Sequence, residues 1–64
     1  MRFKDIDKVL RKNGWVVVRV SKSSHYQYRR EGSENLVTVP NHGSKDIAKG
    51  TLGNIERQSG LVFH

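Results

Sequence analysis

The chain has 64 residues, no cysteine, three histidines and a net charge of +6, which indicates one small domain, residues 1–64, without disulfides or thiolate metal sites. It contains no His-x-x-x-His or His-Glu-x-x-His pattern, and no apolar run approaches the ~18 residues that a membrane span requires. We therefore expect a soluble cytoplasmic domain that uses no metal or other cofactor and does not engage a membrane.

A helix is predicted at the start of the chain. Phe3, Ile6 and Leu10 follow helical spacing. Gly14 is suited to end this helix in a left-handed conformation. The helix is therefore expected over residues 4–13.

Three strands are predicted next. The β-branched run WVVVRV indicates a strand over residues 15–20, and SKSS at 21–24 is typical of a turn. The sequence HYQYRR predicts a second strand over 25–30, and EGSEN at 31–35 is typical of a hairpin loop. LVTVP at 36–40 predicts a third strand, which ends at its proline because proline cannot donate to the ladder.

A second helix is expected over residues 48–59, ended by Gly60, although Gly53 in its interior weakens it. The last four residues, 61–64, allow a short final strand. The predicted fold is α+β in the order α-β-β-β-α, a three-stranded antiparallel sheet with both helices on one face. The other face of the sheet is then free for a partner.

Alternation along the second strand assigns its side chains to the two faces of the sheet. His25, Gln27 and Arg29 share the free face, and Tyr26 and Tyr28 share the core face. In this interpretation the tyrosines are core residues rather than platforms for stacked bases. The residues expected to join them in the core are Val16, Val18, Val20, Val37 and Val39. The residues expected beside His25 on the free face are Trp15, Val17 and Arg19.

Positive charge is concentrated in the first half of the chain. Residues 1–30 contain nine Lys and Arg against two acids, whereas residues 31–64 contain three against four. This division favours a polyanionic partner, nucleic acid first and an acidic protein second. Solubility alone is the other explanation of the charge.

His25 is the candidate for chemistry. RNA is cleaved without a metal when its 2′-OH loses a proton and attacks the neighbouring phosphorus, and an imidazole with an ordinary pKa of about 6.5 suits that proton transfer. Candidate donors to the phosphate oxygens are Arg19, Lys22, Ser23, Ser24 and Arg29. Taken alone, a strand histidine is more often a surface residue, and the same holds for His42 and His64.

Two long segments, KDIDKVLRKNGWVVVRVSKSSHYQY and LVTVPNHGSKDIAKGTLGNIERQSGL, resemble the HicA family of bacterial toxins, also called YcfA-like proteins. The shared features are a helix ending in Asn-Gly-Trp, an Arg four residues after that Trp, and a turn similar to Gly-Ser-His. Two further features are shared. One is VTVP with a His two residues beyond its Pro, and the other is KGTL..I...GL in the last helix. The resemblance covers nearly the whole chain.

This resemblance implies a fold like that of the double-stranded-RNA-binding domain. It also implies ribosome-independent, metal-independent cleavage of mRNA and inhibition by a HicB-like antitoxin. His25 matches the catalytic histidine of the family and would act as general acid or base. The residues expected to position the phosphate or steer single-stranded RNA are Lys22, Ser23, Ser24, Arg19, Arg29 and Arg30.

The chain departs from the family at one position of the turn. Ser23 stands where the family usually has glycine, and serine tolerates a positive φ less well. The second helix has only one cation near its start, Lys49, which argues against duplex RNA and favours single-stranded RNA as the substrate. Two other functions remain open, a non-catalytic RNA-binding module and a component of a repressing toxin–antitoxin complex.

Overall fold

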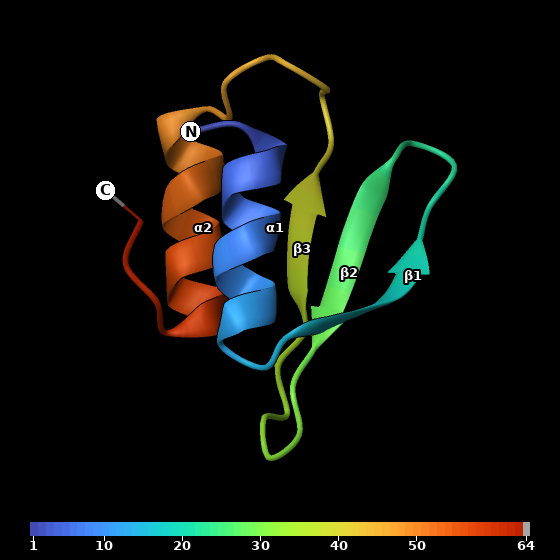
Figure 1. Ribbon diagram of the computed structural model, residues 1–64, viewed down its shortest axis with the longest axis vertical. Coiled ribbons are helices and arrows are strands. Elements are labelled where there is room, and N and C mark those ends of the chain that lie inside the picture. Colours follow the sequence, from blue (N-terminus) through green and yellow to red (C-terminus); the bar gives the residue numbers. More distant parts are fainter. Residues whose placement is uncertain (64) are drawn as a thin grey trace.

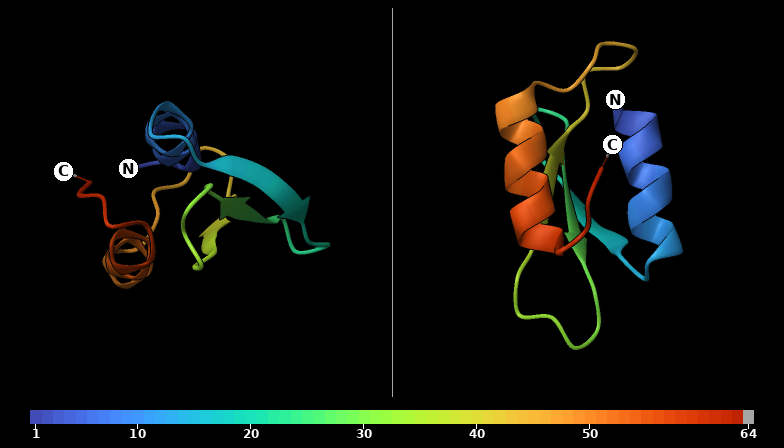
Figure 2. Two further views of the ribbon diagram at one scale, coloured as in Figure 1. Left: turned by 90° about the horizontal axis from the view of Figure 1, so that it is seen from below. Right: turned by 90° about the vertical axis from the view of Figure 1, so that its left-hand side faces the viewer.

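The computed structural model describes residues 1–63. Its elements are α1 (Phe3–Lys12), β1 (Val16–Val20), β2 (His25–Arg29), β3 (Val37–Pro40) and α2 (Lys49–Ser59), as Figure 1 shows. The strands form an antiparallel sheet in the order β1-β2-β3, and both helices lie on the same side of it (Figure 2). The predicted α+β fold, similar to a double-stranded-RNA-binding domain, is confirmed. Neither helix within the described residues has the length and apolar character needed to cross a membrane.

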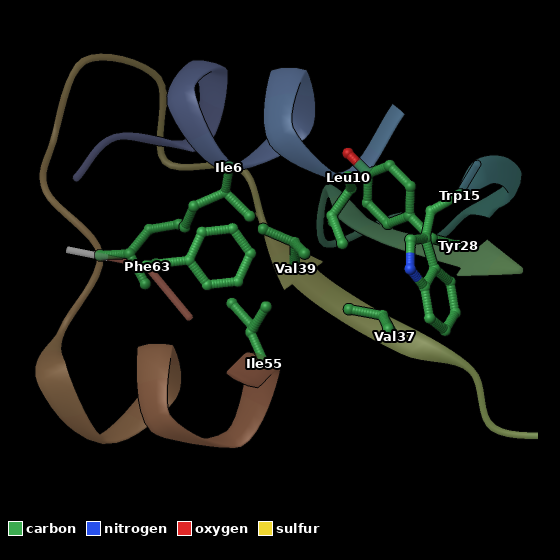
Figure 3. Close-up of a cluster of buried hydrophobic side chains, with 9 residues drawn as sticks. Ile6, Leu10, Trp15, Tyr28, Val37, Val39, Ile55 and Phe63 are labelled. Atoms are coloured by element: carbon green, nitrogen blue, oxygen red, sulfur yellow. The ribbon is translucent and has the colours of Figure 1, made fainter. Parts of the chain in front are cut away.

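The end of α1 sets the direction in which the chain enters the sheet. Gly14 has φ +89°, its N–H donates to the Arg11 carbonyl at 3.1 Å, and the Trp15 N–H donates to the Leu10 carbonyl at 3.0 Å. These two bonds form a Schellman motif, in which the residue after the glycine turns back onto the helix. Trp15 is consequently only 2% exposed and packs in the same cluster as Leu10 (Figure 3).

The hydrophobic core fills the space between the helices and the sheet. Phe63 lies between α1 and α2, beside Ile6 and Ile55 in Figure 3, and its N–H donates to the Glu56 carboxylate at 2.8 Å. Residues 61–63 therefore run between the helices and form no strand, contrary to the prediction, and His64 lies outside the described residues. The core consists of Ile6, Leu10, Trp15, Tyr28, Val37, Val39, Ile47, Ile55 and Phe63.

The predicted alternation of β1 is wrong before Arg19 and correct from Arg19 onward. Val16 and Val18 are 54% and 53% exposed, whereas Trp15 is buried and Val17 packs against the core. Val20 pairs with Tyr26 on the core face, as predicted, although it is 51% exposed at the end of the strand. The cause is a bulge: Val17 pairs with Tyr28, but the next pair is Arg19 with Gln27. Because a bulge adds one residue to one strand, the alternation before it is the reverse of the alternation after it. Arg19 therefore does share the free face of the sheet, as expected, while Trp15 and Val17 do not.

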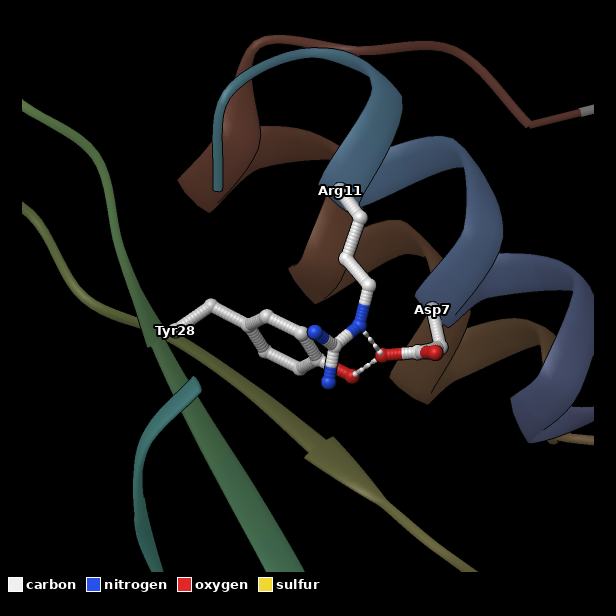
Figure 4. Close-up of polar contacts among 3 residues, drawn as sticks. All are labelled: Asp7, Arg11 and Tyr28. Carbon is white, nitrogen blue, oxygen red and sulfur yellow. Dashed lines mark hydrogen bonds and ion pairs between the residues drawn. The ribbon is translucent and has the colours of Figure 1, made fainter. Parts of the chain in front are cut away.

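A polar contact joins α1 to the sheet. The Tyr28 hydroxyl donates to the Asp7 carboxylate at 2.6 Å, and Arg11 Nε donates to the same oxygen at 2.9 Å (Figure 4). Burial raises the pKa of Tyr28 well above its ordinary value, and the bond to Asp7 raises it further. The hydrogen bond and the charge of Asp7 likewise raise the pKa of Arg11. These bonds fix β2, the strand that begins at His25, against the helical layer.

Candidate functional site

His25 is the first residue of β2 and is exposed. It directly follows a turn that begins at Ser21. The Ser21 N–H donates to the His25 carbonyl at 3.0 Å, and the Ser24 N–H donates to the Ser21 carbonyl at 3.0 Å. The Ser21 hydroxyl also accepts the His25 N–H at 3.2 Å. Three hydrogen bonds to Ser21 therefore fix the main chain at Ser24 and His25. The sequence analysis did not single out Ser21, although a serine in the first position of a turn is the usual signal for such a contact.

The turn contains one strained residue, which is not the one that the sequence suggested. Ser24 has φ +60° and is the only non-glycine residue with a positive φ in residues 1–63. Ser23, which occupies the position of the family glycine, has no such conformation. A left-handed conformation costs a non-glycine residue about 1 kcal/mol, and here that cost falls on the residue directly before His25.

The tip of the turn presents hydrogen-bond donors to solvent. The N–H groups of Lys22 and Ser23 have no acceptor within the part of the chain that the structure describes. Lys22 also brings its ammonium group to the same turn. Free main-chain N–H groups beside an ammonium group can donate hydrogen bonds to an anion, so this tip is suited to the oxygens of a phosphate. Ser23 and Ser24 are both exposed and add their hydroxyls to the turn.

The free face of the sheet brings one arginine close to His25. Arg19 pairs with Gln27, two residues along β2 from His25, so it is a diagonal neighbour of the histidine, with a separation of roughly 7–8 Å. Arg29 pairs with Val16 at the other end of β2, roughly 13 Å along the strand from His25. The face therefore carries one cation beside the histidine and one farther along.

Arg30 lies apart from the turn. Its guanidinium carbon is 5.6 Å from the centroid of the Trp15 ring, the geometry of a cation–π contact. A hollow lies at the same end of the sheet and does not include His25. Its lining residues are Gly14, Val16, Val18, Arg29, Glu31 and Gly32. The structure thus brings Arg19 and residues 21–24 together with His25, and leaves Arg29 and Arg30 at the opposite end.

The loop after β3 is a neighbour of the turn that the sequence analysis did not connect with it. His25 pairs with Pro40 in the sheet, and the Asn41 N–H donates to the Ser24 carbonyl at 2.9 Å. The Asn41 side chain accepts the Gly43 N–H at 3.0 Å, and Gly43 has φ +67°. The sequence Asn-His-Gly is a recognisable signal for such an Asx turn, but only the sheet register places it beside His25.

The arrangement combines groups whose chemistry suits the binding of a phosphodiester and the transfer of a proton. The exposed His25 directly follows the turn that carries two free N–H groups and the Lys22 side chain, and Arg19 is its diagonal neighbour on the same face. Histidine transfers protons near neutral pH, and cations with N–H donors stabilise charge that develops on phosphate oxygens. Within residues 1–63, no three His, Asp or Glu side chains gather in a way that would hold a metal ion.

A comparison with protein families supplies an independent finding. The model of a family described as the HicA toxin of bacterial toxin-antitoxin matches residues 3–61. A comparison with curated proteins found no match. The matched range includes the turn, His25 and the loop after β3.

Proposed function

Because this chain belongs to the HicA toxin family of bacterial toxin–antitoxin systems, we propose that it is an endoribonuclease that cleaves single-stranded mRNA without a metal and independently of the ribosome. The observation that carries the proposal is the exposed His25 beside the free N–H groups of Lys22 and Ser23. Membership of the family implies a cognate antitoxin as partner.

His25 acts as the general base in the proposed reaction. It removes the proton from the 2′-OH, the 2′-oxygen attacks the adjacent phosphorus, and the bond from phosphorus to the 5′-oxygen breaks. The departing 5′-oxygen takes up a proton, so the products are a 2′,3′-cyclic phosphate and a 5′-OH, and no water is consumed in this step. Lys22, the main-chain N–H groups of the turn and the Ser23 and Ser24 hydroxyls hold the non-bridging oxygens, whose negative charge increases in the transition state.

The arginines bind the RNA on either side of the scissile phosphate. Arg19 lies next to His25 and contacts the nearest phosphate, while Arg29 and Arg30 lie farther along the sheet and steer the flanking nucleotides. We propose that a HicB-like antitoxin of acidic character inhibits the enzyme by covering this basic face, because opposite charges favour that association.

The test is the His25→Ala variant. General acid–base catalysis contributes about 10²- to 10⁴-fold, so we expect cleavage of a mixed-sequence RNA to fall by that factor while RNA binding, antitoxin binding and the circular dichroism spectrum are retained. Lys8→Ala is the matched control, since Lys8 is an exposed cation on α1 outside the site.

A second substrate separates this function from its alternatives. An RNA with a 2′-deoxy sugar at the mapped cleavage position should resist the wild-type protein, because it lacks the nucleophile. Wild-type cleavage of that substrate, or full activity of His25→Ala, contradicts the proposed mechanism. Tight RNA binding by the wild-type protein with no product at all indicates a non-catalytic RNA-binding module instead.

A further inference from the structure

Cleavage by the 2′-OH requires two proton transfers. One proton leaves the attacking 2′-oxygen, and another must reach the departing 5′-oxygen, which is otherwise a poor leaving group. When His25 takes the first proton, it is not free to supply the second in the same step. A second group that holds a proton near neutral pH is therefore needed close to the scissile phosphate.

The main chain holds the segment containing His42 against the turn that precedes His25. Pro40 pairs with His25, and the Asn41 N–H donates to the Ser24 carbonyl at 2.9 Å, so the loop after β3 begins against the turn before β2. The Asx turn from Asn41 to Gly43 encloses His42, and the Lys45 N–H donates to the His42 carbonyl at 3.4 Å. The histidine itself is exposed.

Several carboxyl and phenol groups among residues 1–63 that could transfer a proton are occupied or lie elsewhere. Glu31 and Glu34 are in the loop between β2 and β3, at the opposite end of the sheet (Figure 1). The buried Tyr28 hydroxyl donates to the Asp7 carboxylate on the helical side. Asp46 lies 3.8 Å from the N-terminal ammonium group. His42 remains as the second imidazole at the end of the sheet where β2 begins.

From this arrangement we infer that His42 is a catalytic residue, the general acid that gives its proton to the 5′-oxygen as the bond to phosphorus breaks. This inference rests on the proposed endoribonuclease function. The balance is complete: His25 gains the proton of the 2′-OH, His42 loses one to the 5′-oxygen, and one phosphorus–oxygen bond forms as another breaks. After release, proton exchange with solvent restores both imidazoles.

A leaving group that needs no proton tests this role directly. The probe is an oligonucleotide containing the mapped cleavage position with the 5′-oxygen replaced by sulfur, because a thiolate departs without an acid. His42→Gln should cleave the ordinary RNA about 10²- to 10⁴-fold more slowly than wild type and the sulfur-containing RNA at nearly the wild-type rate. His25→Ala should be slow on both RNAs, since the base is needed for each.

The outcomes separate this inference from the proposed function. Wild-type activity of His42→Gln on ordinary RNA overturns the role of His42 and leaves that of His25 intact. A folded His42→Gln that is equally slow on both RNAs also overturns it, since the loss then has another cause. Failure of the wild-type protein to cleave ordinary RNA contradicts the proposed function itself.

The pH dependence of the wild-type protein is a second measurement that requires no variant. The rate on ordinary RNA should fall at high pH, where the acid has lost its proton, and this fall should disappear with the sulfur-containing RNA. The titratable and charged groups on the segments around His42 are the N-terminal ammonium group, Arg2, Lys22, His25, Lys45, Asp46 and Lys49, and they are the same with both substrates. An identical fall at high pH for both RNAs overturns the assignment.

Discussion

The main-chain carbonyl of Ser24 accepts a hydrogen bond of 2.9 Å from the N–H of Asn41. Together with the pairing of His25 and Pro40, this bond makes the turn before β2 and the loop after β3 one structural unit. The two segments are separated in the sequence by two strands and a hairpin loop. A substitution that displaces one of these segments is therefore expected to displace the other.

Asn41→Pro tests this connection because proline has no N–H to donate. We expect a loss of about 1 kcal/mol in the free energy of unfolding, and a larger proportional loss of RNA cleavage as the loop moves away from the turn. Asn41→Ser is the matched control, since it keeps the N–H and a side-chain oxygen that can accept from Gly43. Urea unfolding and a cleavage assay measure both effects, and equal activity of the two variants argues against the coupling.

Substitutions in the turn test where its strain is located. Valine is poorly tolerated at a positive φ, so Ser24→Val should lower the free energy of unfolding by about 1–2 kcal/mol. Ser23→Val, one residue earlier, should change it by only about 0.5 kcal/mol or less. Chemical denaturation of both variants decides the matter, and a larger loss at position 23 would contradict the assignment of the strained residue to Ser24.

Tyr28→Phe tests the link between α1 and the sheet. Because the pKa of Tyr28 is raised in the folded protein, its phenol ionises more easily in the unfolded chain, at the ordinary pKa of about 10. Its contribution to stability is therefore complete below about pH 10 and is lost as the pH rises through the higher folded value. The stability of the variant should not decrease in this way at high pH. At pH 7 its free energy of unfolding should be lower by about 1–2 kcal/mol, because the hydrogen bond to Asp7 is missing.

Unfolding curves of the wild type and the variant, measured from pH 7 to pH 11, provide this comparison. Tyr26→Phe is the control, because Tyr26 packs against Phe3, with ring centroids 4.6 Å apart, and makes no such bond to Asp7. The Tyr28→Phe prediction is wrong if that variant and the wild type lose stability in parallel above pH 10.

Two arginines separate RNA binding from structural support. In a His25→Ala background, Arg19→Gln should weaken RNA binding and reduce the slope of log affinity against log salt by about 0.7, the value for one phosphate contact on a single strand. Arg30→Gln should change this slope less and instead cost about 0.5–1 kcal/mol of stability, because Arg30 lies over Trp15. Equal slopes for both variants would show that Arg19 contacts RNA phosphates no more than Arg30 does.

The order and bounds of the helices and strands could be predicted from the sequence because local chemistry determines them. Gly14 and Gly60 end the two helices at φ +89° and +74°, as expected of glycines after helical segments. Each predicted strand lies within one residue of the observed bounds at either end. The alternation of β1 could not be predicted, because WVVVRV has no polar–apolar alternation and its bulge depends on pairing with β2.

The candidate site was predicted only in part for a similar reason. The position of His25 on the free face could be predicted, because it follows from the alternation of side chains within the single segment HYQYRR. The proximity of Asn41 and His42 depends on the register of β2 with β3, and the pairing of Tyr26 with Val39 and Tyr28 with Val37 in the core determines that register. Contacts between distant segments of this kind require the assembled sheet.

The burial of Trp15 also gives the protein an internal fluorophore. It is the single tryptophan of the chain and is 2% exposed, so its emission should lie at short wavelength in the folded state and shift to the red on unfolding. Trp15 lies before β1, whereas the turn with residues 21–24 follows β1. Substitutions in that turn should therefore leave the emission spectrum unchanged as long as the fold is intact. The same sample used for a cleavage assay then reports, by its fluorescence, whether an inactive variant is folded.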